Sequence, residues 1–110
     1  MNKARRREIF KLIQRLNKLM DKINEATVDL LISEIEDLVD EIQNILYEEE
    51  SVMDNIPENL QGGHIYEKSE DACWNLNDSV SELEDLDVEN TKLEIKNCIL
   101  NVITNLNNCI

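Results

Sequence analysis

The stretch Ile56-Pro57-Glu58-Asn59-Leu60-Gln61-Gly62-Gly63 contains the single proline and both glycines of this 110-residue chain. Proline lacks the backbone donor that a helix interior needs, and glycine commonly follows the end of a helix. Because both residue types are confined to this stretch, they predict one turn over residues 57–63 and long helical segments on either side. Two Gly and one Pro are also too few for the many turns of an all-β protein.

The segment before the turn has the apolar spacing of a helix. Aliphatic side chains recur every three or four residues from Ile9 to Leu30, and the same spacing continues from Leu31 to Ile45. The register slips by one residue between the two runs. This slip leaves two alternatives open, one continuous helix or a break within residues 24–29.

The segment after the turn repeats this spacing over residues 66–83, falters over residues 85–90 and resumes at Ile95. This pattern predicts an acidic helix over residues 64–86 and a C-terminal helix over residues 88–110. Before the turn, it predicts a helical arm and an acidic helix, which the sequence assigns to residues 1–24 and 25–56.

Local signals at the turns predict three further features. Asp87 or Asn90 is expected to cap the C-terminal helix, because short polar side chains accept a hydrogen bond from the first helical turn. Gly62 or Gly63 is expected to adopt a positive φ, which glycine tolerates best. Leu60 is expected to fold back into the hydrophobic core of the hairpin.

Together these elements predict an all-α protein, a single helical unit over residues 1–110. We expect an antiparallel helical hairpin with N- and C-terminal helical extensions, coiled-coil-like and assembled as a homodimer or higher oligomer. A lone hairpin buries only one face of each helix, whereas pairing of two copies buries more. Ile9, Leu12 and Leu16 are expected to contribute the apolar seam of this assembly.

Charge is distributed very unevenly along the chain. Residues 1–24 contain eight bases and two acids, a net charge of +6, whereas residues 25–110 have a net charge of −19. The basic arm has three interpretations: it follows a phosphate backbone, lies on an anionic membrane, or packs along an acidic helix of the same chain or of a second copy. The third is favoured, because Phe10 falls in the apolar stripe and leaves no aromatic platform for nucleic-acid bases. The expected assembly residues of this arm are Arg5, Arg6, Arg7, Lys11 and Arg15, together with the three seam residues.

Few residues are suited to catalysis or metal binding. The one histidine, His64, lies in the turn, and Cys73, Cys98 and Cys109 occupy stripe positions of helices. Glu67-x-x-Glu70 has the spacing of a helical metal motif, but this spacing is common on acidic helices. We therefore expect no catalytic, cofactor or metal site and no enzymatic activity, with a metal-dependent all-α enzyme as a remaining alternative.

Acidic side chains next to aromatic residues are the best candidates for binding a partner protein. Glu48, Glu49 and Glu50 form a run on the helix before the turn, and Tyr47 precedes them. Trp74 lies at the edge of the stripe on the other helix. Carboxylates at helical spacing suit a row of Lys and Arg on a partner, and the aromatic residues supply apolar anchors.

The turn and the helix after it resemble a known group of proteins. Residues 55–62, followed by Tyr66-Glu67-Lys68 and Glu70-Asp71-Ala72, resemble small acidic phage and prophage proteins of Gram-positive bacteria. The resemblance covers about residues 36–86 and implies a protein that counters a host defence system. Gly63-His64-Ile65 departs from the pattern, so the second helix is expected to start with a weak N-cap.

The resemblance and the composition agree on the compartment. Three cysteines without a CxxC pair fit a reducing cytoplasm, and no apolar run approaches the length of a membrane helix. We therefore expect a cytoplasmic inhibitor whose partners are a host defence protein and itself, with no membrane. A structural or regulatory coiled-coil module with a nucleic-acid-binding N-terminal arm is the alternative.

Overall fold

A computed structural model describes all residues from 1 to 110 and contains helices but no strand, which confirms the all-α prediction. The helix before the turn begins and ends close to the predicted positions, and the C-terminal helix begins four residues later than predicted. The elements are α1 (Lys3–Asp21), α2 (Val28–Asp54), the short 3-10 helix η1 (Glu58–Leu60), α3 (His64–Glu84) and α4 (Lys92–Asn107).

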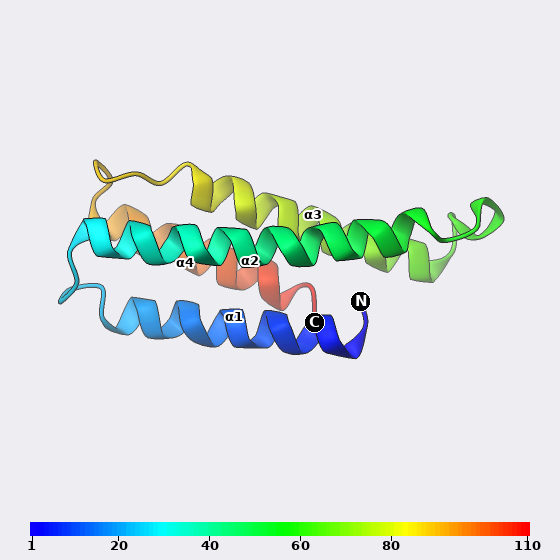
Figure 1. Cartoon of the computed structure of the whole chain (residues 1–110), viewed down its shortest axis with the longest axis horizontal. Helices are drawn as coiled ribbons and strands as arrows, with labels where there is room; N and C mark the ends of the chain where they lie inside the picture. Colours follow the sequence, from blue (N-terminus) through cyan, green and yellow to red (C-terminus); the bar gives the residue numbers. More distant parts are fainter.

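The four helices run alternately up and down and form one elongated bundle, 52 × 23 × 18 Å in extent (Figure 1). Each helix packs on the next in the chain, and α4 packs back on α1, so the helices close into a ring. The expected terminal extensions of a hairpin are therefore absent, because α1 and α4 complete the bundle instead. Only the end of α2, η1 and the start of α3 project beyond the other two helices (Figure 1).

The core is aliphatic and includes residues from all four helices. Ile9 and Leu16 of α1 are fully buried, as are Ile42 of α2, Leu76 of α3 and Ile99 of α4. The apolar stripe of α1, which was expected to form a seam between copies, is thus used within one chain. Burying four amphipathic helices against one another removes each stripe from water without a second copy.

The chain breaks between α1 and α2, which decides between the two alternatives left by the sequence. Residues 22–27 form a turn, and Thr27 caps α2 by accepting a hydrogen bond from the backbone N–H of Leu30 at 3.2 Å. Ile23 stays buried within the turn and keeps the connection attached to the core. The slip in apolar register therefore marks a new helix with its own face.

The turn after α2 needs no left-handed residue, so the expected positive φ at a glycine is wrong. The 3-10 helix reverses the chain through backbone hydrogen bonds from Leu60 N–H to the Pro57 carbonyl at 2.8 Å and from Gly63 N–H to the Leu60 carbonyl at 3.0 Å. Leu60 is 56% exposed and does not fold back into the core. Gly63 is the N-cap of α3 and offers no side-chain hydrogen bond, as expected for a weak cap.

The N-cap of α4 is Thr91, not Asp87 or Asn90. Thr91 Oγ1 accepts a hydrogen bond from Glu94 N–H at 3.1 Å, and Glu94 Oε1 accepts one from Thr91 N–H at 2.9 Å, which is a capping box. Asn90 Oδ1 instead accepts a hydrogen bond from Asp87 N–H at 2.8 Å and holds the preceding loop. The sequence signal Thr-x-x-Glu was present but lay one residue beyond the predicted cap.

Replacing Thr91 by Ala is expected to lower the free energy of unfolding by about 1 kcal/mol, because one backbone donor of α4 loses its acceptor. The hydrogen bond from the Thr91 backbone also lowers the pKa of Glu94. A depressed folded-state pKa gives stability above the unfolded-state pKa, and this stability is lost as the pH falls through the folded-state pKa. The destabilisation caused by Glu94→Gln should therefore shrink toward acid pH.

Urea denaturation at neutral and acidic pH measures both effects. Thr104→Ala is the matched control, because Thr104 is an exposed threonine in the last turn of the same helix, far from its N-cap. Equal losses for Thr91→Ala and Thr104→Ala would contradict a capping role for Thr91.

Candidate functional site

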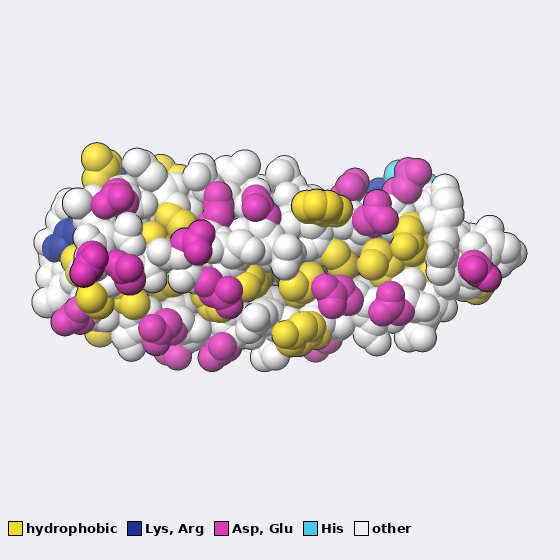
Figure 2. Space-filling model, turned by 90° about the horizontal axis from the view of Figure 1, so that it is seen from above, with side chains coloured by type: hydrophobic (Ala, Val, Ile, Leu, Met, Phe, Trp, Pro, Cys, Tyr) yellow, Lys and Arg dark blue, Asp and Glu magenta, His cyan; other side chains and the backbone are white.

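The surface of α2 and α3 is strongly acidic. Helix α2 has ten Asp and Glu residues and no Lys or Arg, and α3 has six acids and one Lys. Figure 2 shows one long face of the bundle, where acidic side chains are spread over the whole length and hydrophobic side chains lie among them. This arrangement provides negative charge together with apolar contact area.

Two aromatic residues and a groove add apolar area to this acidic face. Tyr47 on α2 is 59% exposed and Trp74 on α3 is 69% exposed, and Glu48 beside Tyr47 is also exposed. A groove of about 420 Å³ runs between α2 and α3, with an aliphatic floor and carboxylates at its edge. Its lining comprises Ile32, Ile35, Val39, Leu83 and Leu86 with Glu36, Asp40 and Glu84.

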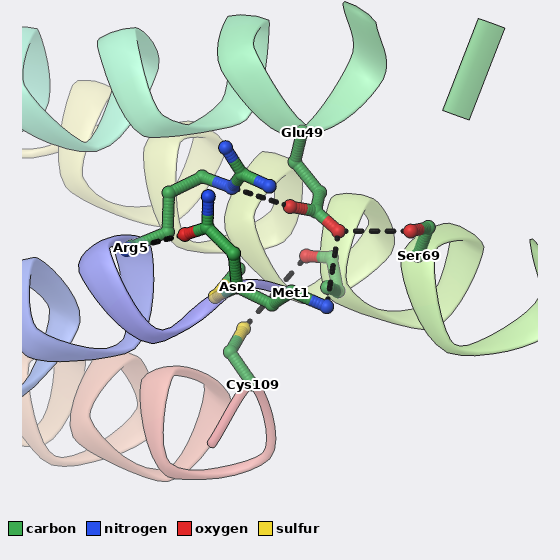
Figure 3. A network of polar contacts seen from close by, with 7 residues as sticks. Met1, Asn2, Arg5, Glu49, Ser69 and Cys109 are labelled. Atoms are coloured by element: carbon green, nitrogen blue, oxygen red, sulfur yellow. Dashed lines mark hydrogen bonds and ion pairs between the residues drawn. The ribbon is translucent and has the colours of Figure 1, made fainter. Parts of the chain in front are cut away.

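Glu49 differs from its neighbours, because its side chain is fully buried. Its Oε2 accepts a hydrogen bond from Arg5 Nε at 2.8 Å, and its Oε1 accepts one from Ser69 Oγ at 2.9 Å. The N-terminal ammonium of Met1 lies 3.5 Å from Oε1 (Figure 3). The Glu49 carboxylate of α2 therefore connects α2 to α1 and to α3 through hydrogen bonds.

The structure thus removes Glu49 from the expected partner-binding surface and leaves Glu48 exposed and Glu50 half-buried. The signal was available in the sequence, since Ile42, Ile45 and Glu49 follow one another at helical spacing. An acid at a stripe position faces the core and needs partners there. Only the packing of α1 and α3 supplies those partners.

The other predicted assembly bases separate into two groups, and Lys22, which was not predicted, joins the first. Arg15 pairs with Glu41, and Lys22 pairs with Glu34 at 2.9 Å, so the basic arm does lie along acidic α2 of the same chain. Both pairs are exposed, and pairs of this kind contribute at most about 1 kcal/mol each. The second group, Arg6, Arg7 and Lys11, points away from α2 and lines a separate basic groove on α1.

The histidine, the cysteines and the acids that were considered as metal ligands do not come together in the structure. No three His, Cys, Asp or Glu residues are grouped to hold a metal ion. Burial raises the pKa of Cys73 and of Cys98 to about 11 and that of Cys109 to about 12, with nearby acids adding to the shift. The thiols are therefore protonated at neutral pH, which makes them weak nucleophiles.

Comparisons with known proteins assign no family to this chain. None of the helices has the length and apolar character needed to cross a membrane. No protein-family model, curated protein or solved structure matches the chain.

Proposed function

We propose that this protein is a non-enzymatic inhibitor that binds a basic surface of another protein through the acidic face of α2 and α3. The observation that carries this proposal is that α2 and α3 carry carboxylates that take part in no ion pair, together with the exposed aromatic residues Tyr47 and Trp74. Complementary charge speeds association and selects the partner, whereas buried aromatic anchors supply most of the affinity.

The resemblance to phage and prophage proteins supports a component of host antiviral defence as the target, in the bacterial cytoplasm. Proteins that handle nucleic acid present rows of Lys and Arg to phosphates. The carboxylates along α2 and α3 recur about once per helical turn. They are therefore spaced to contact a row of Lys and Arg side chains, as the phosphates of a nucleic acid do. An inhibitor of this design competes with nucleic acid for the basic surface of its target.

The test measures phage plating on bacteria that express a defence system together with this protein. Wild-type protein is expected to restore plating against the targeted system. The double variant Glu48→Lys/Glu50→Lys and the single variant Trp74→Ala are each expected to reduce this restoration about tenfold or more, since the first reverses charge on α2 and the second removes an aromatic anchor from α3.

The matched control is Glu25→Lys/Glu89→Lys, which changes the net charge equally at exposed positions outside α2 and α3. It should retain the activity of the wild type, and circular dichroism should show unchanged helicity for every variant. Restoration of plating that is the same for the face variants and the wild type would refute the acidic-face mechanism.

A further inference from the structure

A shallow basic groove, wide open to solvent, lies along the first half of α1 and reaches Ile110. Its volume is about 550 Å³. The residues that define it are Lys3, Arg6, Arg7, Phe10, Lys11 and Ile110. From Lys3 to Lys11 the groove follows about 12 Å of helix, at about 1.5 Å per residue. It lies on α1, and its residue Arg6 also lines a neighbouring pocket together with Asp71 of α3.

The bases of this groove are not used to hold the fold together. Among the eight bases of residues 1–24, Arg5, Arg15 and Lys22 pair with acids of α2. Lys3, Arg6 and Arg7 take part in none of the five ion pairs. The remaining groove base, Lys11, has only the exposed acid of its own helix three residues before it, at 3.7 Å. The groove therefore carries the positive charges of Lys3, Arg6 and Arg7, which have no ion-pair partner in the protein.

An aromatic ring lies among these bases. Phe10 is 54% exposed, whereas the stripe residues Ile9 and Ile13 are buried. Successive residues of a helix are rotated by about 100°, so the ring turns away from the core that Ile9 enters. Phe10 therefore lies outside the apolar stripe in which the sequence placed it. Its exposed ring gives the basic arm an aromatic platform on which a nucleic-acid base can stack.

We propose that the basic groove binds an unpaired strand of nucleic acid. Arg6, Arg7, Lys3 and Lys11 contact phosphates, and one base stacks on the ring of Phe10. A strand without a complement is required, because a base inside a duplex already has both faces stacked. Stacking and phosphate contacts are tolerant of base and sugar, so the groove accepts a strand of any sequence.

The net charge of −13 sets the expected strength of this binding. Acids elsewhere on the bundle repel a strand, but at physiological salt charges act over only about 8 Å. Binding is therefore expected to be modest and strongly dependent on salt. Neutralising four phosphates of a single strand predicts about a 20-fold loss of affinity between roughly 50 and 150 mM salt.

The test uses fluorescence anisotropy of a short labelled oligothymidylate with the full-length protein. The variant Arg6→Glu/Arg7→Glu should weaken binding about tenfold or more, because two phosphate contacts become repulsive. Lys18→Glu/Lys96→Glu is the matched control with the same net charge, since both lysines are exposed and outside the groove. Its affinity should stay within about threefold of the wild type.

Three substitutions of Phe10 distinguish stacking of a base on the aromatic ring from a general hydrophobic contact. Phe10→Tyr should retain binding, whereas Phe10→Leu and Phe10→Ala should each lose about tenfold, because leucine has no π-face on which a base can stack. A duplex of the same length should bind more weakly than the single strand. Unchanged far-UV circular dichroism confirms that each variant keeps its helices.

Four results would overturn the proposal. The first two are a wild type that does not bind the strand at low salt, and a duplex that binds as tightly as the single strand. The other two are a Phe10→Leu variant that binds as tightly as the wild type, and a control variant Lys18→Glu/Lys96→Glu that loses as much affinity as Arg6→Glu/Arg7→Glu. Light scattering adds a fifth: if copies associate and Arg6→Glu/Arg7→Glu abolishes the association, the groove binds the acidic face of a second copy instead.

Discussion

Replacing Glu49 by Ala should lower the free energy of unfolding by about 3 kcal/mol, one of the two largest effects expected for this protein. The substitution leaves the Arg5 guanidinium without its counter-charge and the Ser69 hydroxyl without its acceptor inside the bundle. Burying an unpaired charge or donor costs far more than losing a surface contact. Urea unfolding followed by circular dichroism measures the loss.

The neighbouring Glu48→Ala is the matched control, because the same residue type is exposed one position earlier and its removal should change stability by less than about 0.5 kcal/mol. A double variant, Arg5→Met/Glu49→Leu, should regain most of the stability, since both charges leave the interior together. If Glu49→Ala and Glu48→Ala were equally stable, the buried network would contribute nothing to the fold.

Replacing Leu16 by Ala should also cost about 3 kcal/mol, because its side chain is fully buried between helices and leaves a cavity when truncated. The loss should be the same over about a hundredfold range of protein concentration, since the cavity lies within one chain. Phe10→Ala on the same helix is the control and should cost much less, because Phe10 is 54% exposed.

Denaturation midpoints at several concentrations distinguish the monomer core from a seam between copies. A midpoint that rises with concentration for the wild type, and less for Leu16→Ala, would place Leu16 in an interface and contradict the expected result. Assembly into a homo-oligomer itself stays a prediction, and it would now have to use surfaces other than the buried stripe of α1.

The sequence by itself determined the all-α class, the approximate extent of α2 and α3, and the segregation of charge. These features depend on local physics: the helical spacing of aliphatic residues and the confinement of Pro57, Gly62 and Gly63 to one turn. The opposite charges of the first two helices likewise indicated that the basic arm lies along an acidic helix. That inference left open whether the helix belongs to the same chain.

The tertiary structure alone decided which face of each helix is inside. The spacing of apolar residues defines a stripe along a helix. The width of the stripe that becomes buried depends on how many helices pack against it, and in this ring of four helices each helix packs against two others. This closure buries Leu16 within one chain, draws Glu49 into the interior beside Arg5, and leaves Phe10 outside among unpaired bases. The physical reason is that burial is a property of packed neighbours, which no local pattern of residues contains.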